Sequence, residues 1–191
     1  MCIRDSYLGM ALRENCRLSD LSEEFLTFSR LERGVLELQL IPLDLKELIE
    51  PMVDDLREQY EDVELSLLGE FYVMALADEA AVLTVVRNLI ENAWNYSEGV
   101  KKVEVSIVDG DEEVAFLVKD EGRGLSAKDC KRVFRQFYRV EKKLSRSQDG
   151  LGLGLSIVKR LVDGMGGRIE VESEKGRGSV FSVFLKKGGE V

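Results

Sequence analysis

Residues 88–97 of the chain read NLIENAWNYS, and three of these ten side chains are asparagine amides. Asn88, Asn92 and Asn95 are spaced i, i+4 and i+7, so a helix places all three on one face. The other side of such a helix is apolar and predicted to be buried: Val82, Val85, Val86, Leu89, Ile90 and Ala93. Amide oxygens are hard ligands that suit Mg²⁺ beside phosphate groups, although a solvated polar face also explains the pattern.

A second stretch, residues 120–125, reads DEGRGL and follows an apolar run that alternates as a β-strand does. Asp120, at the end of this strand, is able to accept a hydrogen bond from an exocyclic amino group. Gly122 and Gly124 permit a tight turn and the close approach of a ligand. Taken alone, a D-x-G-x-G pattern is more often only a turn.

A third stretch, residues 150–156, reads GLGLGLS and opens a predicted helix. Glycines ahead of a helix N-terminus present backbone N–H groups and the positive end of the helix dipole to a phosphate. The stretch lacks the G-K-[ST] ending of a Walker A loop and the G-x-x-G spacing of a Rossmann fingerprint. It is therefore a weak phosphate signal when read by itself.

A basic segment separates the second stretch from the third. Residues 128–146 contain eight Lys or Arg and two Asp or Glu, a net charge of +6, whereas the whole chain carries −9. This segment is either a solvated helix and loop or a local anion site on a protein that otherwise repels anions.

Length and composition exclude several kinds of protein. The chain has 191 residues, 45% of them hydrophobic, which predicts one domain with a sizeable core, or one domain with an appendage. It contains no histidine, so Ser-His-Asp triads and HExxH zinc sites are excluded. The acidic balance argues against non-specific nucleic-acid binding. The three cysteines form no C-x-x-C, and no apolar run is long enough to span a membrane, so we expect a cytoplasmic protein.

Hydrophobic periodicity predicts an α+β sandwich, a mixed sheet covered by helices on one face, that begins near residue 35. Strands are predicted over residues 35–41, 63–68, 71–75, 103–108, 113–119, 169–171 and 180–185, the first ending at Pro42. Helices are predicted from Asp44 to about Tyr60, from Asp78 through the asparagines, from Ser126 to near Phe137, and over residues 153–165.

An amphipathic helix is predicted ahead of this sandwich. Its apolar stripe consists of Ala11, Leu18, Leu21, Phe25 and Phe28, and Gly34 follows as a C-cap. One such helix cannot bury its stripe alone, so we expect a partner from the same chain or from another copy.

Together, in this order and at these distances, the stretches resemble the Bergerat ATP-binding fold. Residues 35–187 resemble the catalytic and ATP-binding domain of bacterial sensor histidine kinases. Residues 88–97, 120–125, 133–139 and 150–155 are similar to the N, G1, F and G2 boxes of that family, and Gly176-x-Gly178-Ser179 also matches. The ending SRLERG of residues 29–34 resembles the end of the second helix of the dimerisation and phosphoacceptor domain.

This resemblance implies a domain division and a two-layer Bergerat α/β sandwich preceded by the amphipathic helix. Residues 35–191 are expected to be the catalytic ATP-binding domain, and residues 1–34 the remnant of the dimerisation domain, with a non-native start over 1–6. The first helix and its phosphoacceptor histidine are expected upstream in a parent protein.

The resemblance also implies ATP and Mg²⁺ as ligands and assigns roles to individual residues. Asn92 is expected to coordinate Mg²⁺, with Asn88 and Arg139 supporting catalysis, and Asp120 to bind the adenine amino group. The residues expected to contact the nucleotide are Asn88, Asn92, Asn95, Tyr96, Asp120, Gly122, Gly124, Leu125, Phe137, Arg139, Lys142, Gly150, Leu151, Gly152, Leu153, Gly154, Leu155 and Ser179.

Two positions depart from the family pattern. Asn95 stands where the N box usually has Lys, and Gln136 where the F box usually has Arg. Each replaces a cation near the phosphates with an amide, which keeps hydrogen bonding but loses charge assistance. We therefore expect weaker ATP affinity or slower transfer, and an ATP-binding interaction module without kinase activity stays open as an alternative.

The residue at position 88 separates kinases from hydrolases of the same fold. Gyrase-like and Hsp90-like relatives carry a Glu there as the hydrolytic base, and an amide such as Asn88 cannot take a proton from water. The resemblance therefore implies phosphoryl transfer to a separate histidine, for relay to the aspartate of a response regulator receiver domain. It further implies a homodimer through a four-helix bundle and membrane contact only through upstream parts of the parent.

Overall fold

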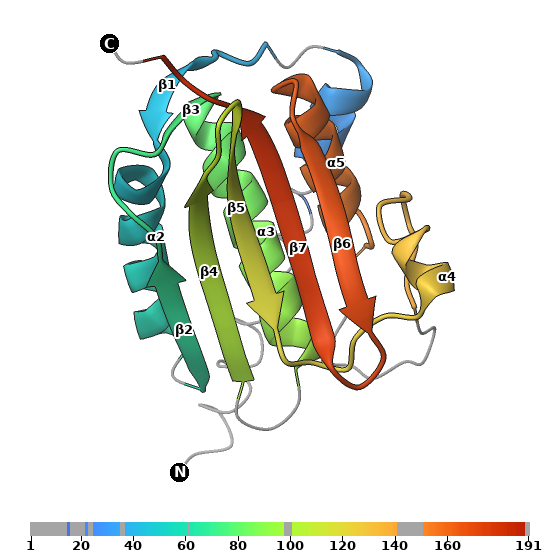
Figure 1. Ribbon diagram of the computed structural model, residues 1–191. Coiled ribbons are helices and arrows are strands. Elements are labelled where there is room, and N and C mark those ends of the chain that lie inside the picture. The colour runs from blue at the N-terminus through green and yellow to red at the C-terminus, as the bar shows by residue number, and fades with distance from the viewer. Residues whose placement is uncertain are drawn as a thin grey trace.

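The computed structural model describes residues 15, 22, 25–34, 37–60, 62–97, 101–140 and 151–189, which form a two-layer α/β sandwich (Figure 1). One layer is a five-stranded mixed sheet. In spatial order its strands are β2 (Val63–Leu68), β4 (Lys101–Asp109), β5 (Glu113–Asp120), β7 (Gly178–Lys186) and β6 (Arg168–Glu174). The pair β2–β4 is parallel and the other pairs are antiparallel.

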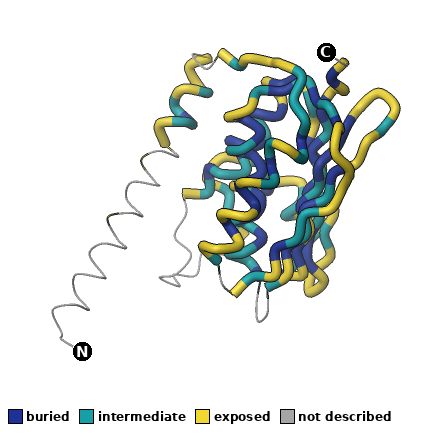
Figure 2. The backbone as a smooth tube through the Cα atoms, turned by 90° about the vertical axis from the view of Figure 1, so that its left-hand side faces the viewer, coloured by how far each residue is buried: buried dark blue, intermediate teal, exposed yellow. Residues whose placement is uncertain are grey.

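Three helices form the second layer and cover one face of the sheet (Figures 1 and 2). They are α2 (Leu45–Gln59), α3 (Glu79–Tyr96) and α5 (Gly154–Gly164). The core lies between the layers, where Phe116 of β5, Leu89 of α3 and Val158 of α5 are fully buried. The predicted α+β class, with helices on one face of a mixed sheet, is thus confirmed. Within the described ranges, no helix has both the length and the hydropathy needed to cross a bilayer.

Most predicted elements occur where the pattern places them. Asp44 caps α2 and Asp78 caps α3 through their carboxylates. The hairpin β4–β5, the helix α5 and the last two strands are also confirmed, the strands being longer than predicted.

The first strand lies later in the chain than predicted. The prediction of a strand over 35–41 that ends at Pro42 is wrong, because β1 covers Ile41–Asp44 and contains Pro42. This strand pairs with β3 (Met74–Ala77) in a separate two-stranded antiparallel sheet. Strands at a sheet edge tolerate proline because its missing N–H need not face a neighbour.

The strand predicted over 71–75 also begins later, at Met74. Tyr72 has a φ of +67°, which lies in the left-handed region and is incompatible with a strand. Its N–H donates to Asp44 Oδ2 at 2.5 Å, so the turn before β3 is held by the residue that caps α2.

The helix predicted from Ser126 to near Phe137 is shorter than expected. Helix α4 covers only Ala127–Cys130, and it starts with a capping box between Ser126 and Asp129. Turns follow over residues 131–137, and Phe137 has a φ of +57° that no right-handed helix accommodates.

The end of the amphipathic helix lies on the sandwich. Residues 25–32 are helical, and Gly34 follows with a φ of +63°, as its predicted role as C-cap requires. Phe28 is only 9% exposed, whereas Phe25 is 53% exposed. The same chain thus supplies the expected partner for Phe28, whereas Phe25 is left largely exposed; Ala11, Leu18 and Leu21 lie outside the described residues.

Candidate functional site

The three asparagines lie half-buried along α3, as their spacing predicts. Asn88 Nδ2 donates to the Thr84 carbonyl at 2.9 Å, and Asn92 Nδ2 donates to the Asn88 carbonyl at 2.8 Å. Both amide nitrogens are therefore bound to the preceding turn of their own helix. The Oδ1 atoms lie on the other branch of each amide and remain as acceptors for a cation.

Asp120 lies at the end of β5 and is buried, with 7% of its surface exposed. Its Oδ1 accepts the N–H of Gly122 at 2.8 Å, and Ser179 lies opposite on β7 and also hydrogen-bonds to it. Burial raises the pKa of the Asp120 carboxyl, and the hydrogen bonds from Gly122 and Ser179 oppose that shift. The geometry yields a buried acceptor at a strand end, as the sequence predicts.

The two glycines after Asp120 are required by protein packing. A Cβ on Gly122 would lie 2.6 Å from the Tyr96 carbonyl oxygen. Gly124 has a φ of +61°, and a Cβ there would lie 2.0 Å from the Glu174 carbonyl oxygen. The sequence predicts that these two glycines allow the close approach of a ligand. In the structure, glycine is required because the backbone at each position lies close to another backbone segment.

The loop after β5 also reaches the C-terminal end of α3. The N–H of Arg123 donates to the Tyr96 carbonyl at 3.2 Å, and the Arg123 guanidinium lies 4.7 Å from the centre of the Tyr96 ring. The asparagine helix and the Asp120 loop are thereby joined at Tyr96.

Ser173 on β6 completes the hydrogen bonding around this loop, and the sequence analysis missed it. Its Oγ accepts the N–H of Leu125 at 2.7 Å, donates to the Gly178 carbonyl at 2.8 Å and lies 3.0 Å from Ser179 Oγ. Nothing in the local sequence marks this serine, because its partner Leu125 lies 48 residues away.

A second group of predicted residues gathers at the start of α5. The N–H of Phe137 donates to the Gly152 carbonyl at 3.0 Å, and Gly152 has a φ of +72°. A Cβ on Gly152 would lie 3.2 Å from the Phe137 carbonyl carbon and 3.3 Å from Arg139 Cγ. Leu153 is fully buried in the core, so only its backbone is available to a ligand.

The other residues predicted around these glycines have varied surroundings. Gly154 is the first residue of α5, Leu155 is half-buried, and Leu151 is 38% exposed. Gly150 and Lys142 lie outside the described residues.

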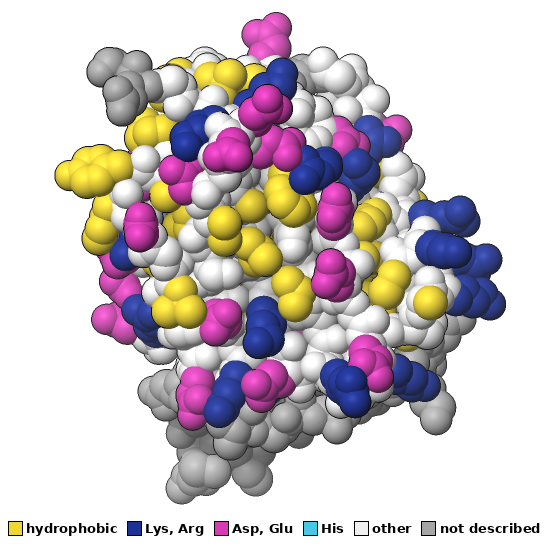
Figure 3. Space-filling model, in the orientation of Figure 1, with side chains coloured by type: hydrophobic (Ala, Val, Ile, Leu, Met, Phe, Trp, Pro, Cys, Tyr) yellow, Lys and Arg dark blue, Asp and Glu magenta, His cyan; other side chains and the backbone are white. Residues whose placement is uncertain are grey.

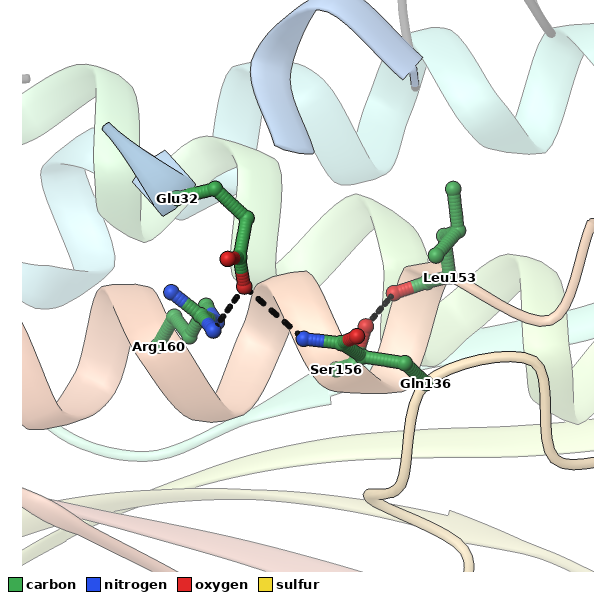
Figure 4. Close-up of polar contacts among 5 residues, drawn as sticks. All are labelled: Glu32, Gln136, Leu153, Ser156 and Arg160. Carbon is green, nitrogen blue, oxygen red and sulfur yellow. Dashed lines mark hydrogen bonds and ion pairs between the residues drawn. The ribbon is translucent and has the colours of Figure 1, made fainter. Parts of the chain in front are cut away.

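Gln136 contacts the helical segment that precedes the sandwich. Its Nε2 donates to Glu32 Oε1 at 2.9 Å, on the helical segment 25–32 (Figure 4). The side chain of Gln136 is therefore bound by a carboxylate from another part of the chain, and its expected place beside the phosphates stays a prediction.

The two groups of residues meet through the helix layer. Asp120, Ser179 and Tyr96 form one group, and Gly152, Phe137 and Arg139 form the other. Helix α3 packs against α5, which places the two groups on adjoining elements.

Basic side chains gather beside this region, at the right of the view in Figure 3, over α4 and the turns after it. The described members of the basic segment include four exposed cations: Lys128, Lys131, Arg132 and Arg135. Their exposure fits both earlier explanations, a solvated surface and a surface that attracts anions.

Known proteins match both this fold and these stretches. Residues 77–189 match the family model described as Histidine kinase-, DNA gyrase B-, and HSP90-like ATPase. Sensor protein GacS of Pseudomonas syringae pv. syringae is 36% identical over 188 residues, which are 94% of this chain and 21% of GacS. Sensor protein SrrB of Staphylococcus aureus is 29% identical over 187 residues, which are 94% of this chain and 31% of SrrB.

A solved structure agrees over the whole chain. The crystal structure of full-length ShkA in complex with AMPPNP has a TM-score of 0.83 and 27% identity, covering 100% of this chain and 40% of that one. Fold and matches together define an ATP-binding ATPase domain. The chain belongs to the histidine kinase-, DNA gyrase B- and HSP90-like ATPase family, and it spans about a fifth to a third of the sensor proteins it matches.

Proposed function

We propose that this domain binds ATP with Mg²⁺ and transfers the γ-phosphate to a histidine on a phosphoacceptor helix. The observation that carries this proposal is the pair of amides, Asn88 and Asn92, on the half-buried face of α3. A carboxylate at position 88 would activate water, but an amide cannot act as that base. The phosphoryl group is then left for an acceptor from another part of the protein.

The donor set fits a magnesium ion held jointly with the nucleotide. Among the described residues, no group of three Asp, Glu, Cys or His side chains is placed to hold a metal by itself. Mg²⁺ usually keeps several waters and takes one or two protein ligands plus substrate phosphates. Asn92 Oδ1 is the ligand we propose, with Asn88 beside it; the ion would neutralise phosphate charge during transfer.

Asp120 is the residue we propose for recognition of the base. A buried carboxylate at the end of β5 accepts a hydrogen bond from the adenine amino group more strongly than an exposed one, because water does not compete. Arg139, Gly152 and Gly154 adjoin the proposed phosphate end, where the backbone at the start of α5 offers N–H groups.

The relatives' descriptions as sensor proteins support a role in two-component signalling. We propose that residues 35–191 act as the catalytic domain and residues 1–34 as part of a dimerisation helix in a homodimeric parent. The partner that finally receives the phosphate would be a response regulator receiver domain, in the cytoplasm.

Nucleotide titration of the chain tests the site. We expect Asn92→Ala and Asp120→Ala each to weaken binding of AMPPNP by about tenfold or more, since the first removes a proposed ligand of Mg²⁺ and the second a charged hydrogen-bond acceptor. The Asn92→Ala effect should disappear when EDTA removes Mg²⁺, whereas the Asp120→Ala effect should persist. Asp111→Ala, at an exposed position of the β4–β5 connection, is the control and should bind as the wild type does.

Unchanged affinity in both site variants would overturn the assignment of the pocket. An Asn92→Ala loss that is equally large without Mg²⁺ would remove the metal role of that residue while leaving the nucleotide site in place.

Transfer in trans distinguishes the kinase from a binding-only module. The 191 residues contain no histidine, so labelled ATP should leave no phosphohistidine on the chain alone. A separately produced phosphoacceptor domain with its histidine should become labelled when both are mixed. ATP binding without any transfer would favour the alternative, a regulatory ATP-binding module.

A further inference from the structure

One carboxylate joins three distant parts of the chain. Glu32, at the end of the helical segment 25–32, accepts hydrogen bonds on the same Oε1 from Gln136 Nε2, at 2.9 Å, and from the Arg160 guanidinium (Figure 4). Gln136 lies in the turns after α4, and Arg160 lies on α5. In sequence these partners are 104 and 128 residues from Glu32.

An aromatic contact accompanies this ion pair one turn earlier in the same helix. The ring of Phe28 meets the edge of the Phe137 ring with 6.3 Å between centroids, and the Arg160 guanidinium lies 5.8 Å from the Phe28 centroid. Arg160 therefore contacts both Phe28 and Glu32, which are four residues apart and share a helix face. A surface ion pair alone contributes little, but burial of Phe28 makes this a defined docking contact.

The docking contact reaches the proposed phosphate end of the site directly. Gln136 precedes Phe137, whose N–H is bound to the Gly152 carbonyl. Phe137 has a φ of +57°, which is unfavourable for a residue with a Cβ, so its surroundings hold it there. Phe28 on one side and Gly152 on the other provide these surroundings.

Arg160 connects the same contact to α5. This helix begins at Gly154, and its first turn is anchored by the Ser156 hydroxyl on the Leu153 carbonyl at 2.7 Å (Figure 4). The helical segment thus touches the turn around Phe137 and, through Arg160, the middle of the helix whose start would face the phosphates.

We propose that Glu32 forms an autoinhibitory contact that couples docking of the segment 25–32 to nucleotide binding. The docked carboxylate binds the amide of Gln136, which adjoins the proposed phosphate end through Phe137, and the guanidinium of Arg160 on α5, and it adds negative charge near that end. Release of Glu32 frees both donors and removes that charge, so nucleotide affinity rises. This inference rests on the proposed nucleotide site.

Coupling of this kind acts in both directions. If docking lowers nucleotide affinity by a given factor, bound nucleotide must weaken docking by the same factor. Bound nucleotide should therefore expose Phe28 and the backbone amides around it.

The test is a titration of the full chain with AMPPNP and Mg²⁺. Glu32→Gln keeps the shape of the side chain but removes its charge, and we expect affinity to rise about threefold or more. Glu37→Gln removes an equal charge from an exposed side chain that lies five residues away, and it should leave affinity unchanged.

Hydrogen exchange gives a readout that does not depend on affinity. Amides of residues 25–34 should exchange faster when AMPPNP is added to the wild type, and fast with or without it in Glu32→Gln. A double-mutant cycle with Arg160→Gln should show effects that do not add, since Glu32 acts through Arg160.

The outcomes separate this inference from the proposed function. If the wild type binds nucleotide but Glu32→Gln binds with equal or lower affinity, or if exchange at 25–34 ignores the nucleotide, the coupling is wrong and the site stands. If the wild type binds no nucleotide, the proposed function fails first.

Discussion

Asp120 combines two demands that conflict in a single residue. Its carboxylate must be ionised to accept strongly from an amino group, yet its burial between β5 and β7 disfavours the charge. The N–H of Gly122 and the hydrogen bonds from Ser179 reduce that penalty without removing it, so the pKa of the Asp120 carboxyl stays above its ordinary value. Burial of the ionised Asp120 carboxylate therefore lowers the stability of the fold, and Asp120 is the residue that we propose for recognition of the base.

This conflict predicts a pH-dependent gain of stability in Asp120→Asn. A carboxyl whose pKa is raised by folding is best tolerated below its unfolded pKa, and its contribution to stability falls as pH rises through the folded pKa. The melting temperature of Asp120→Asn should equal that of the wild type near pH 3 and exceed it at pH 7. Asp111→Asn, at an exposed position of the β4–β5 connection, is the control variant.

A melting-temperature difference that stays constant from pH 3 to pH 8 would contradict this account of Asp120. The same variant should bind AMPPNP more weakly at pH 7, because a neutral amide replaces the charged acceptor.

At the residue scale, the sequence predicts which side chains the site contains better than it predicts which partners those side chains bind. The spacing of the asparagines on α3 and the strand end at Asp120 are local patterns, so the asparagines and Asp120 lie where they were expected. The partner of Gln136 and the role of Ser173 were missed because the residues they contact lie 104 and 48 residues away. No local pattern encodes which distant carboxylate or N–H a side chain will find.

At the element scale, Asp44 organises the end of the small sheet at which β1 ends and β3 begins. Its Oδ1 accepts the N–H groups of Lys46 and Glu47 at the start of α2, at 2.9 and 3.2 Å. Its Oδ2 accepts the N–H of Tyr72, whose left-handed conformation delays β3. The carboxylate thus acts as a helix cap and as the anchor of a strained turn.

We therefore expect Asp44→Ala to destabilise the fold by about 1–2 kcal/mol, as loss of a helix N-cap usually does. Asp55→Ala is a matched control on the exposed side of the same helix and should change stability by less than about 0.5 kcal/mol. Urea unfolding of the two variants measures the difference. Equal stabilities would show that the cap and the Tyr72 contact contribute nothing.

Elements were predictable where their own residues define them. Neighbouring residues determine the alternation of β2, the β4–β5 hairpin and the caps of α2, α3 and α4. The errors fall on β1, on β3 and on the end of α4. At these places pairing with another strand or a contact such as Phe137 with Gly152 decides the conformation, and local propensity is overruled.

At the scale of the whole molecule, stability depends on the layer between sheet and helices. Leu89 of α3 is fully buried there, whereas Leu68 at the end of β2 is 50% exposed. Leu89→Ala should cost about 2–5 kcal/mol, because it removes buried methyl groups and leaves a cavity. Leu68→Ala, the same substitution at the edge, should cost less than about 1 kcal/mol.

Thermal or urea unfolding of the two leucine variants checks the layer arrangement. Comparable losses of stability in both variants would be incompatible with a core that lies on one face of the sheet.

The outer strand β6 has a consequence for how the protein behaves in concentrated solution. An unpaired strand edge is a template on which further strands can add, and such addition leads to aggregation. On β6, the side chains of Glu170, Glu172 and Glu174 are exposed, and α4 lies beside part of the strand. A second molecule that approached this edge would meet a row of charged side chains, these glutamates and their partners Arg168 and Arg177, and it would have to displace them before a further strand could add.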